Sequence, residues 1–298
     1  MGEISPAKTP GTSMIWTALI AVYLIWGSTY LAIRFALEGG LPPFLMAGVR
    51  FVIAGALMLI FLRLRGEKMP TRMQWRNVSI MGLLLLVFGN GLVCVAEQTV
   101  SSGLTAVAVA SAPIWMGIFS ALRGEHPSKP EWIGIAIGFI GVLWLNAGSS
   151  LSGSMTGMIA LILASLAWSF GSIWSRGKDL PTPFVTSGGQ MLAGGLLMLV
   201  VALVLGERWP HEVSNKALGS VAYLIVMGSI IGFSAYVWLL KHVRPALAGS
   251  YAYVNPVIAV ILGALLANEK FGTNDLLPMG IILLGVVAMT VGKARRAK

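Results

Sequence analysis

The chain has 298 residues, of which 56% are hydrophobic and 11% are charged. An ordinary soluble domain carries about 25% charged residues, so composition excludes a water-soluble fold of this size. The formal net charge of +10 is compatible with nucleic-acid binding, but the basic residues lie in short segments between long apolar stretches. We therefore expect this charge to orient the chain in a lipid bilayer, and we do not expect nucleic acid as a partner.

Ten stretches are apolar enough to cross a bilayer, which takes about 20 residues per helix. In chain order they cover residues 14–33, 44–64, 78–97, 103–122, 132–147, 155–174, 184–205, 217–240, 246–267 and 275–292. The connections between them are short and polar, and many contain Pro or Gly. The sequence therefore predicts an all-α membrane protein with ten transmembrane helices.

The second half of the chain repeats the first. WGSTYLAIR from Trp26 is matched by WSFGSIW from Trp168, 142 residues later, and Pro113 is matched by Pro256 after 143 residues. This predicts two five-helix repeats, 14–147 and 155–292, joined by a segment rich in Gly and Ser. Because five is an odd number, the second repeat enters the membrane in the opposite direction. Inverted repeats of this kind are typical of secondary transporters.

Basic residues are strongly biased to one side of this topology. With ten spans, sixteen Lys and Arg residues lie on the side that holds both termini, and four lie on the opposite side. Cytoplasmic loops carry an excess of Lys and Arg. We therefore expect the N- and C-termini to be cytoplasmic.

Three motifs resemble the EamA family of the drug/metabolite transporter superfamily. They are WGSTYLAIR in the first span, the mid-span arginine of AGVRF, and NPVIAVILGALLANE in the ninth span. The resemblance covers nearly the whole chain and extends to exporters of the bacterial inner membrane. It implies a central cavity formed by spans 1, 3, 4, 6, 8 and 9, with spans 5 and 10 at the periphery. It also implies export of amino acids or other small metabolites without an ATPase.

Arg50 is the one charged residue deep inside a predicted span. An arginine left in lipid costs about 2.5–3.5 kcal/mol on insertion scales, so it needs a partner. Glu97, near the outer end of the third span, lies at a compatible depth. Arg50 could have a structural role, paired with Glu97 or in contact with backbone carbonyl groups, or it could bind a substrate carboxylate directly. In either case we expect these residues to form a charged gate or support.

Aromatic and polar side chains inside the spans are a second set of candidates. Trp26 and Tyr30 share a helix face because they are four residues apart, and Trp168 is the counterpart of Trp26. Aromatic rings offer stacking and cation–π contacts, and hydroxyl and amide groups orient a ligand. Helix packing is an equally good interpretation for the deep tryptophans. The predicted substrate-binding residues are Trp26, Thr29, Tyr30, Asn90, Trp115, Trp168, Ser172, Tyr251, Tyr253 and Asn255.

Pro113 and Pro256 are predicted helix breaks at matching places in spans 4 and 9. Each proline frees a backbone carbonyl in its helix. The glycine-containing segments GNG at 89–91 and GSIIG at 228–232 loosen spans 3 and 8. Interrupted helices in matching positions of two repeats point to a binding site near the midplane. A kink that serves packing alone is the alternative.

Catalytic chemistry is poorly supported. No Asp or Glu lies in the middle of a span, and the sequence holds neither a nucleophile–base pair, nor a metal-ligand cluster, nor an ATP-binding motif. We expect no enzyme activity, metal or cofactor. The main hypothesis is a transporter that exports small metabolites (amino acids, amines or related compounds) by alternating access. A passive channel or facilitator, and an importer of the same substrates, are the alternatives. Proton coupling would have to involve Glu97 or be indirect.

Overall fold

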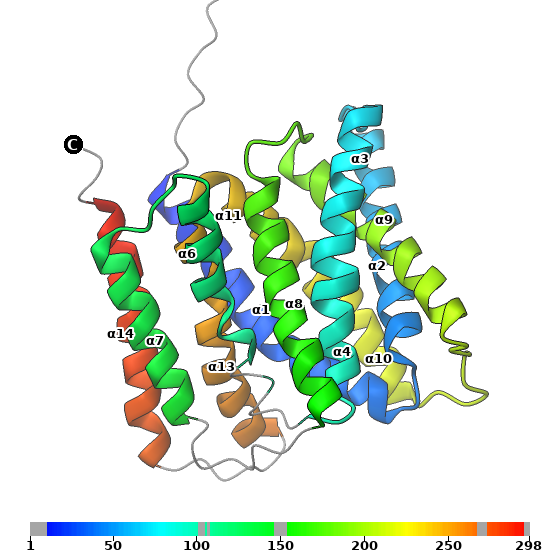
Figure 1. Cartoon of the computed structure of the whole chain (residues 1–298). Coiled ribbons are helices and arrows are strands. Elements are labelled where there is room, and N and C mark those ends of the chain that lie inside the picture. The colour runs from blue at the N-terminus through cyan, green and yellow to red at the C-terminus, as the bar shows by residue number, and fades with distance from the viewer. Residues whose placement is uncertain (1–10, 101–104, 106–107, 146–153, 267–272, 295–298) are drawn as a thin grey trace, which may run out of the picture.

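The computed structural model describes residues 11–100, 105, 108–145, 154–266 and 273–294. All regular elements in these ranges are helices (Figure 1). Parts of the expected spans 103–122 and 246–267, and nearly all of the segment that joins the repeats, lie outside the described residues. The helices are α1 (Thr12–Glu38), α2 (Pro43–Leu64), α3 (Arg72–Met81), η1 (Gly82–Gly91), α4 (Leu92–Ala96), α6 (Ala112–Leu122), α7 (Lys129–Leu145), α8 (Met155–Ser175), α9 (Pro183–Val204), α10 (Asn215–Tyr223), η2 (Leu224–Phe233), α11 (Ser234–His242), α12 (Pro245–Gly249), α13 (Tyr251–Leu266) and α14 (Thr273–Ala294).

Six helices among the described residues are long and apolar enough to cross a membrane. Four of them are α1, α2, α8 and α9. The other two are continuous helices that combine several elements: Arg72–Ala96 contains α3, η1 and α4, and Asn215–His242 contains α10, η2 and α11. The apolar helices Ala112–Leu122 and Leu276–Met289 are shorter. Many large apolar side chains of these helices are exposed, among them Leu57, Ile60, Leu163, Val204 and Leu284. An apolar outer surface on long helices is what a lipid environment requires, so the chain is an all-helical membrane protein.

Helices at matching positions of the two repeats pack against each other. In the α2–α9 pair, Gly48 lies against Gly195 and Gly55 lies against Gly188. The early glycine of one helix meets the late glycine of the other, so the pair is antiparallel. A Cβ atom on Gly195 would lie 2.7 Å from the backbone nitrogen of Val52, and one on Gly55 would overlap Leu192. Small residues let helix backbones approach this closely. An antiparallel pairing of equivalent helices is the geometry that inverted repeats require.

The α7–α14 pair follows the same rule at one edge of the molecule (Figure 1). A Cβ atom on Gly134 would lie 2.6 Å from the carbonyl oxygen of Gly285, and one on Gly285 would lie 2.6 Å from the backbone nitrogen of Gly138. The GxxxG pattern of residues 134–138 therefore serves close helix packing. The peripheral place of this pair agrees with what the family resemblance implies for spans 5 and 10.

The predicted helix breaks at the two prolines are wrong in detail. Pro113 lies in the first turn of α6, directly after a turn at residues 110–111, where its missing N–H is not needed. Pro256 lies inside α13, and the chain turns earlier, at Ser250, between α12 and α13. The glycine-containing segments instead form π-helices, η1 and η2, whose first residues are 142 apart. π-Helical turns are rare and occur often at functional sites.

We predict that replacing Gly55 by Val destabilises the protein, because the new side chain would overlap the backbone of α9. Overpacking of this kind costs about 1–3 kcal/mol. Thermal unfolding in detergent measures the effect. The control is Gly219→Ala in α10, where a Cβ atom meets nothing within 4 Å. Equal unfolding temperatures for Gly55→Val and Gly219→Ala would contradict the close α2–α9 contact.

Candidate functional site

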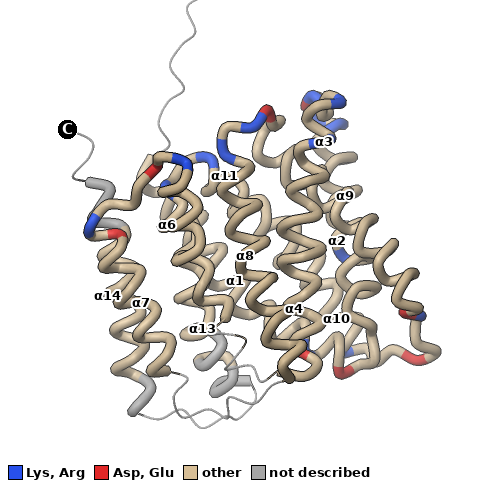
Figure 2. Tube along the Cα trace, viewed as in Figure 1, with Lys and Arg blue, Asp and Glu red and all other residues tan. Residues whose placement is uncertain are grey.

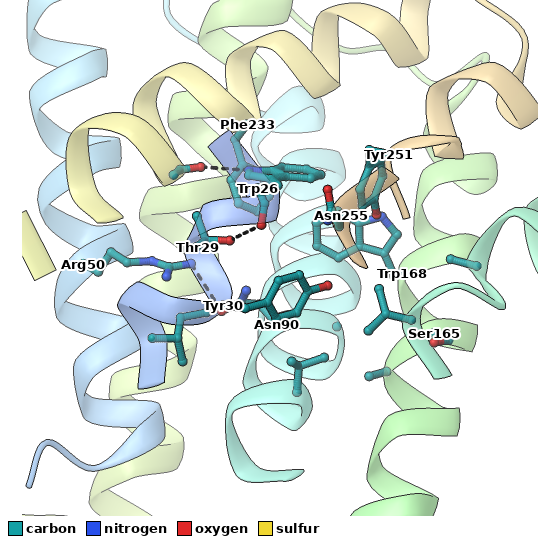
Figure 3. A pocket seen from close by; sticks show the side chains of 17 residues that line it. Trp26, Thr29, Tyr30, Arg50, Asn90, Ser165, Trp168, Phe233, Tyr251 and Asn255 are labelled. Carbon is teal, nitrogen blue, oxygen red and sulfur yellow. Dashed lines mark hydrogen bonds between the residues drawn. The ribbon is translucent and has the colours of Figure 1, made fainter. Parts of the chain in front are cut away.

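A cavity with an empty volume of about 690 Å³ lies in the middle of the bundle, between the two repeats (Figure 3). Helices α1, α6, α8, α13, η1 and η2 line it, as the family resemblance implies, and Arg50 adds a contribution from α2. The lining residues are Trp26, Thr29, Tyr30, Ile33, Arg50, Gly89, Asn90, Val93, Val109, Ala112, Ala164, Ser165, Trp168, Gly228, Phe233, Tyr251 and Asn255.

Most of the residues that the sequence singles out come together in this cavity. They are Trp26, Thr29, Tyr30, Arg50, Asn90, Trp168, Tyr251 and Asn255. They come from five different helices and are separated by up to 229 positions in the chain. Binding of a substrate by these side chains stays a prediction.

Three predicted binding residues do not line the cavity. The indole of Trp115 donates a hydrogen bond to Ser111 Oγ (3.2 Å) in its own helical region. Tyr253 is buried against α7, where its hydroxyl donates to the carbonyl oxygen of Ile135 (3.0 Å). Ser172 is buried and shares a hydrogen bond with the hydroxyl of Tyr236 (2.7 Å). These three side chains therefore lie outside the cavity lining, and a role for them in substrate binding stays a prediction.

A cluster of aromatic rings covers one end of the cavity. Trp26 contacts Trp168, Phe233, Tyr236 and Tyr251, with ring centroids 4.8–5.5 Å apart. Such edge-to-face and tilted pairs each contribute about 0.5–1.5 kcal/mol beyond burial. Sequence reasoning missed Phe233 and Tyr236. Their position directly after the GSIIG segment was the signal that could have found them.

The two matching tryptophans lie on glycines of the π-helices. A Cβ atom on Gly89 of η1 would lie 2.8 Å from Cε3 of Trp168, and one on Gly232 of η2 would overlap Nε1 of Trp26. The indole of Trp26 donates to the carbonyl oxygen of Gly228 (3.1 Å), whereas that of Trp168 donates to the hydroxyl of Tyr236 (2.9 Å). The glycines let both rings pack closely, and the different hydrogen bonds make the site asymmetric.

The aromatic cluster lies toward the end of the bundle that carries both described chain ends. On α1, which starts at this end, Trp26 precedes Tyr30, and on α13 Tyr251 precedes Asn255 (Figures 1 and 3). On α8, which runs the opposite way, Trp168 follows the cavity residue Ser165. The rings therefore separate the cavity from the end at which the chain begins.

Arg50 has no acidic partner in the cavity. Its side chain is only 3% exposed, its Nη2 donates to Asn90 Oδ1 at 3.3 Å, and its guanidinium carbon lies 4.1 Å from the ring centroid of Phe51. The expected Arg50–Glu97 ion pair is not formed, and the ion pairs of the described residues join other groups. Glu97 follows Asn90 by seven residues, which places it about 10 Å further along the helix.

Unpartnered polar atoms remain inside the cavity. Nε and Nη1 of Arg50 are buried without a hydrogen-bond partner, and so is Oδ1 of Asn255, a residue that is 2% exposed. A buried polar group without a partner costs about 1–3 kcal/mol, and more if it is charged. A ligand that accepts hydrogen bonds from Arg50 and donates one to Asn255 would remove these costs.

Polar contacts between the repeats lie beyond the aromatic cluster, at the end that carries the chain ends. Arg244 forms an ion pair with the buried Glu131 (2.9 Å) and donates to the carbonyl oxygen of His126. Arg176 lies 3.6 Å from Glu125, and it also donates to two carbonyl oxygens at the end of α11. Burial lowers the pKa of Arg176, and the Glu125 carboxylate opposes that effect. These contacts join the end of α6 and the start of α7 to the end of α8 and the start of α12.

The described residues contain no group of three or more His, Cys, Asp or Glu side chains that could hold a metal ion. An apolar helical bundle that encloses a binding cavity between two repeats is typical of membrane transporters. The profile of the EamA-like transporter family matches this chain twice, over residues 12–147 and 155–291. The chain belongs to this family of transporters.

Relatives carry transporter names as well. The chain is 45% identical over 280 residues to "Uncharacterized inner membrane transporter YedA" of Escherichia coli K12, covering 94% of this chain and 91% of the relative. It is 24% identical to "WAT1-related protein At3g02690, chloroplastic" of Arabidopsis thaliana, covering 93% of this chain and 69% of the relative. A solved crystal structure with 20% identity superposes with a TM-score of 0.79 over 97% of this chain and all of the other, which shows the shared fold. These names indicate a transporter and not an enzyme.

We predict that Trp168→Phe lowers transport about fivefold, because it removes the hydrogen bond to Tyr236 in the aromatic cluster. A lost hydrogen bond of about 1 kcal/mol corresponds to a factor of about five. The matched control is Trp115→Phe, since Trp115 makes its hydrogen bond outside the cavity. Counterflow in proteoliposomes measures both variants. Equal losses in the two would contradict the special role of the cavity tryptophan.

Proposed function

We propose that this protein is a secondary transporter of the bacterial inner membrane that exports small metabolites, such as amino acids, amines or related compounds. In this proposal ten spans form two inverted repeats that alternate access to the central cavity, and both termini are cytoplasmic. Figure 2 supports the orientation, since Lys and Arg gather mainly at the end of the bundle where α3 begins. Cytoplasmic ends of membrane proteins carry this excess of basic residues.

The observation that carries the proposal is the guanidinium of Arg50, whose Nε and Nη1 are buried without a hydrogen-bond partner in a cavity that no described acidic residue lines. Arginine binds carboxylates through two parallel hydrogen bonds. Across the cavity, the rings of Trp26, Trp168 and Tyr251 and the free amide oxygen of Asn255 provide a surface for an ammonium group. This pairing of a cation with an aromatic and amide surface suits a zwitterion such as an amino acid.

The contacts at the cytoplasmic end support alternating access. The aromatic cluster and the Arg176–Glu125 and Arg244–Glu131 ion pairs close the cavity on that side. All three sets of contacts join residues of the first repeat to residues of the second. Rocking of one repeat against the other would break them and open the cavity to the cytoplasm, the movement expected for inverted repeats.

A passive facilitator or an importer would use the same cavity. Export is favoured by the family resemblance, and a carrier mechanism is favoured over a channel by the aromatic cluster that interrupts the path. Exchange or uniport is consistent with the absence of acidic residues from the middle of the predicted spans.

We predict that Arg50→Gln lowers counterflow of amino acids at least tenfold and leaves counterflow of the corresponding amines, which lack the carboxylate, within about twofold. The reason is that the variant removes the proposed carboxylate partner, and a charged hydrogen bond contributes about 1.5–3 kcal/mol. Arg63→Gln, an exposed residue at the end of α2, is the control. Proteoliposomes loaded with unlabelled substrate measure both reactions, with and without a pH gradient. Parallel losses for amino acids and amines would show that Arg50 is only structural.

We predict that Arg244→Gln opens the cytoplasmic end, because it breaks the ion pair with buried Glu131. In a background with Cys94 replaced by Ser, a cysteine at the cavity position Ala112 reports access to the cavity. Labelling by a membrane-impermeant thiol reagent in inside-out vesicles should become about tenfold faster, which corresponds to a shift of about 1.4 kcal/mol. Arg63→Gln should leave the rate unchanged. A rate that Arg244→Gln does not alter would contradict the closing role of the pair.

A further inference from the structure

A second cavity, with an empty volume of about 800 Å³, lies at the cytoplasmic end of the bundle. It is bounded by the ends of α3, α8 and α11 and by the start of α9, and it shares no lining residue with the central cavity. Its polar lining includes Glu125, Arg176, Lys178, Thr186 and Lys241. The proposed transport step uses the Arg176–Glu125 contact but assigns no role to the space beside it.

The lining of this cavity is predominantly positive. Three cationic side chains face it, and Glu125 is the one acidic residue that lines it. Arg176 is held in place, because its Nη1 donates to the carbonyl oxygens of Leu240 and Val243. Its Nε is buried and makes no hydrogen bond, although Glu125 lies 3.6 Å away. The Lys178 ammonium lies 5.0 Å from the ring centroid of Trp174. Part of the positive charge is therefore fixed in position, and Glu125 is its one acidic neighbour among the described residues of the cavity lining.

The start of α9 adds to this positive potential. Pro183 and Thr186 of its first turn line the cavity, and the helix begins without a side-chain cap. At the opposite end of the bundle, the start of α2 is capped by Glu207, which accepts hydrogen bonds from the backbone N–H groups of Phe44 and Leu45. An uncapped helix start carries about half a positive charge and favours anions. The start of α9 therefore adds to the positive potential that three basic side chains already give this cavity.

The position of this cavity along the membrane normal indicates which kind of anion it could bind. The cavity lies where the apolar helices end, which in the proposed orientation is the level of the lipid headgroups of the cytoplasmic leaflet. Basic pockets between transmembrane helices on this side bind anionic headgroups. Arginine and lysine together suit a phosphate, which has several oxygens that accept hydrogen bonds.

We propose that this cavity binds a phosphate group, carried by an anionic phospholipid of the cytoplasmic leaflet or by a free phosphate anion. The assignment of this cavity to the cytoplasmic leaflet depends on the orientation given under the proposed function. Phosphate binding itself does not depend on transport. A ligand here contacts Arg176, which already joins the end of α8 to the end of α11 and faces Glu125 of the first repeat. Its binding would add to the contacts that close the cytoplasmic end.

Thermal unfolding of the full chain in detergent tests this proposal. The protein is titrated with phosphatidylglycerol or with phosphatidylcholine, and separately with inorganic phosphate or with chloride at equal ionic strength. The variant is Lys178→Gln/Lys241→Gln, which changes two exposed side chains of the cavity. The matched control is Arg72→Gln/Arg76→Gln, which removes the same charge from exposed positions of α3 outside the cavity.

The expected result is a rise in unfolding temperature with phosphatidylglycerol or inorganic phosphate, relative to the phosphatidylcholine and chloride arms. The half-saturating concentration should increase about fivefold for each lysine removed and by less than twofold in the control. A response to phosphatidylglycerol alone would identify a lipid headgroup, and a response to inorganic phosphate a free anion. Equal changes in the cavity variant and the control, or no preference for phosphate in the wild type, would overturn the proposal. The single variant Lys241→Gln, with an intermediate shift expected, covers the case in which the double variant fails to fold.

Discussion

The contact between α2 and α9 sets the arrangement of the rest of the molecule. Both helices place glycines where the two backbones meet, and a Cβ atom at these positions would overlap the opposite helix. In lipid, helices gain little from hydrophobic association, so close backbone packing supplies much of the specificity. The contacting glycines are counterparts in the two repeats, and the pair runs antiparallel, as inverted repeats require. The α7–α14 pair repeats the arrangement at the edge.

The cavity is built on this symmetric frame but is itself asymmetric. Trp26 and Trp168 occupy matching positions, and each lies on a glycine of a π-helix from the other repeat. The counterpart of Arg50 is Gln190, which is also buried and has side-chain atoms without hydrogen-bond partners, but it is neutral and lies outside the cavity lining. In the proposed function, the frame allows two conformations to exchange, and the residues that differ between the repeats select the substrate.

The predicted site residues that line the cavity include those marked by the repeat and by their cost in lipid. Trp26 and Trp168 stood out because each occurs at the same place in its repeat, and Arg50 because a charge in an apolar helix is expensive. Spacing placed Ser172 and Tyr253 with the cavity residues although both lie outside the cavity lining, because spacing shows which residues share a helix face and not which face points inward. In a soluble protein the polar face identifies the outside. Here lipid and core are both apolar, so the polarity of neighbouring residues did not show that Phe233 and Tyr236 face the inside of the bundle.

The sequence by itself determined that most of the chain lies in lipid, that its second half repeats the first, and that Lys and Arg are concentrated in one set of loops. These properties depend only on composition and on order along the chain. The resemblance to known transporters also depends on residue order alone. Only the tertiary structure decided that Arg50 meets Asn90 and not Glu97, that the chain turns before each proline, and that aromatic rings close one end of the cavity. These features depend on distances between helices that are far apart in the chain. In a membrane those distances are set by how closely glycine-bearing faces pack, which no single helix encodes alone.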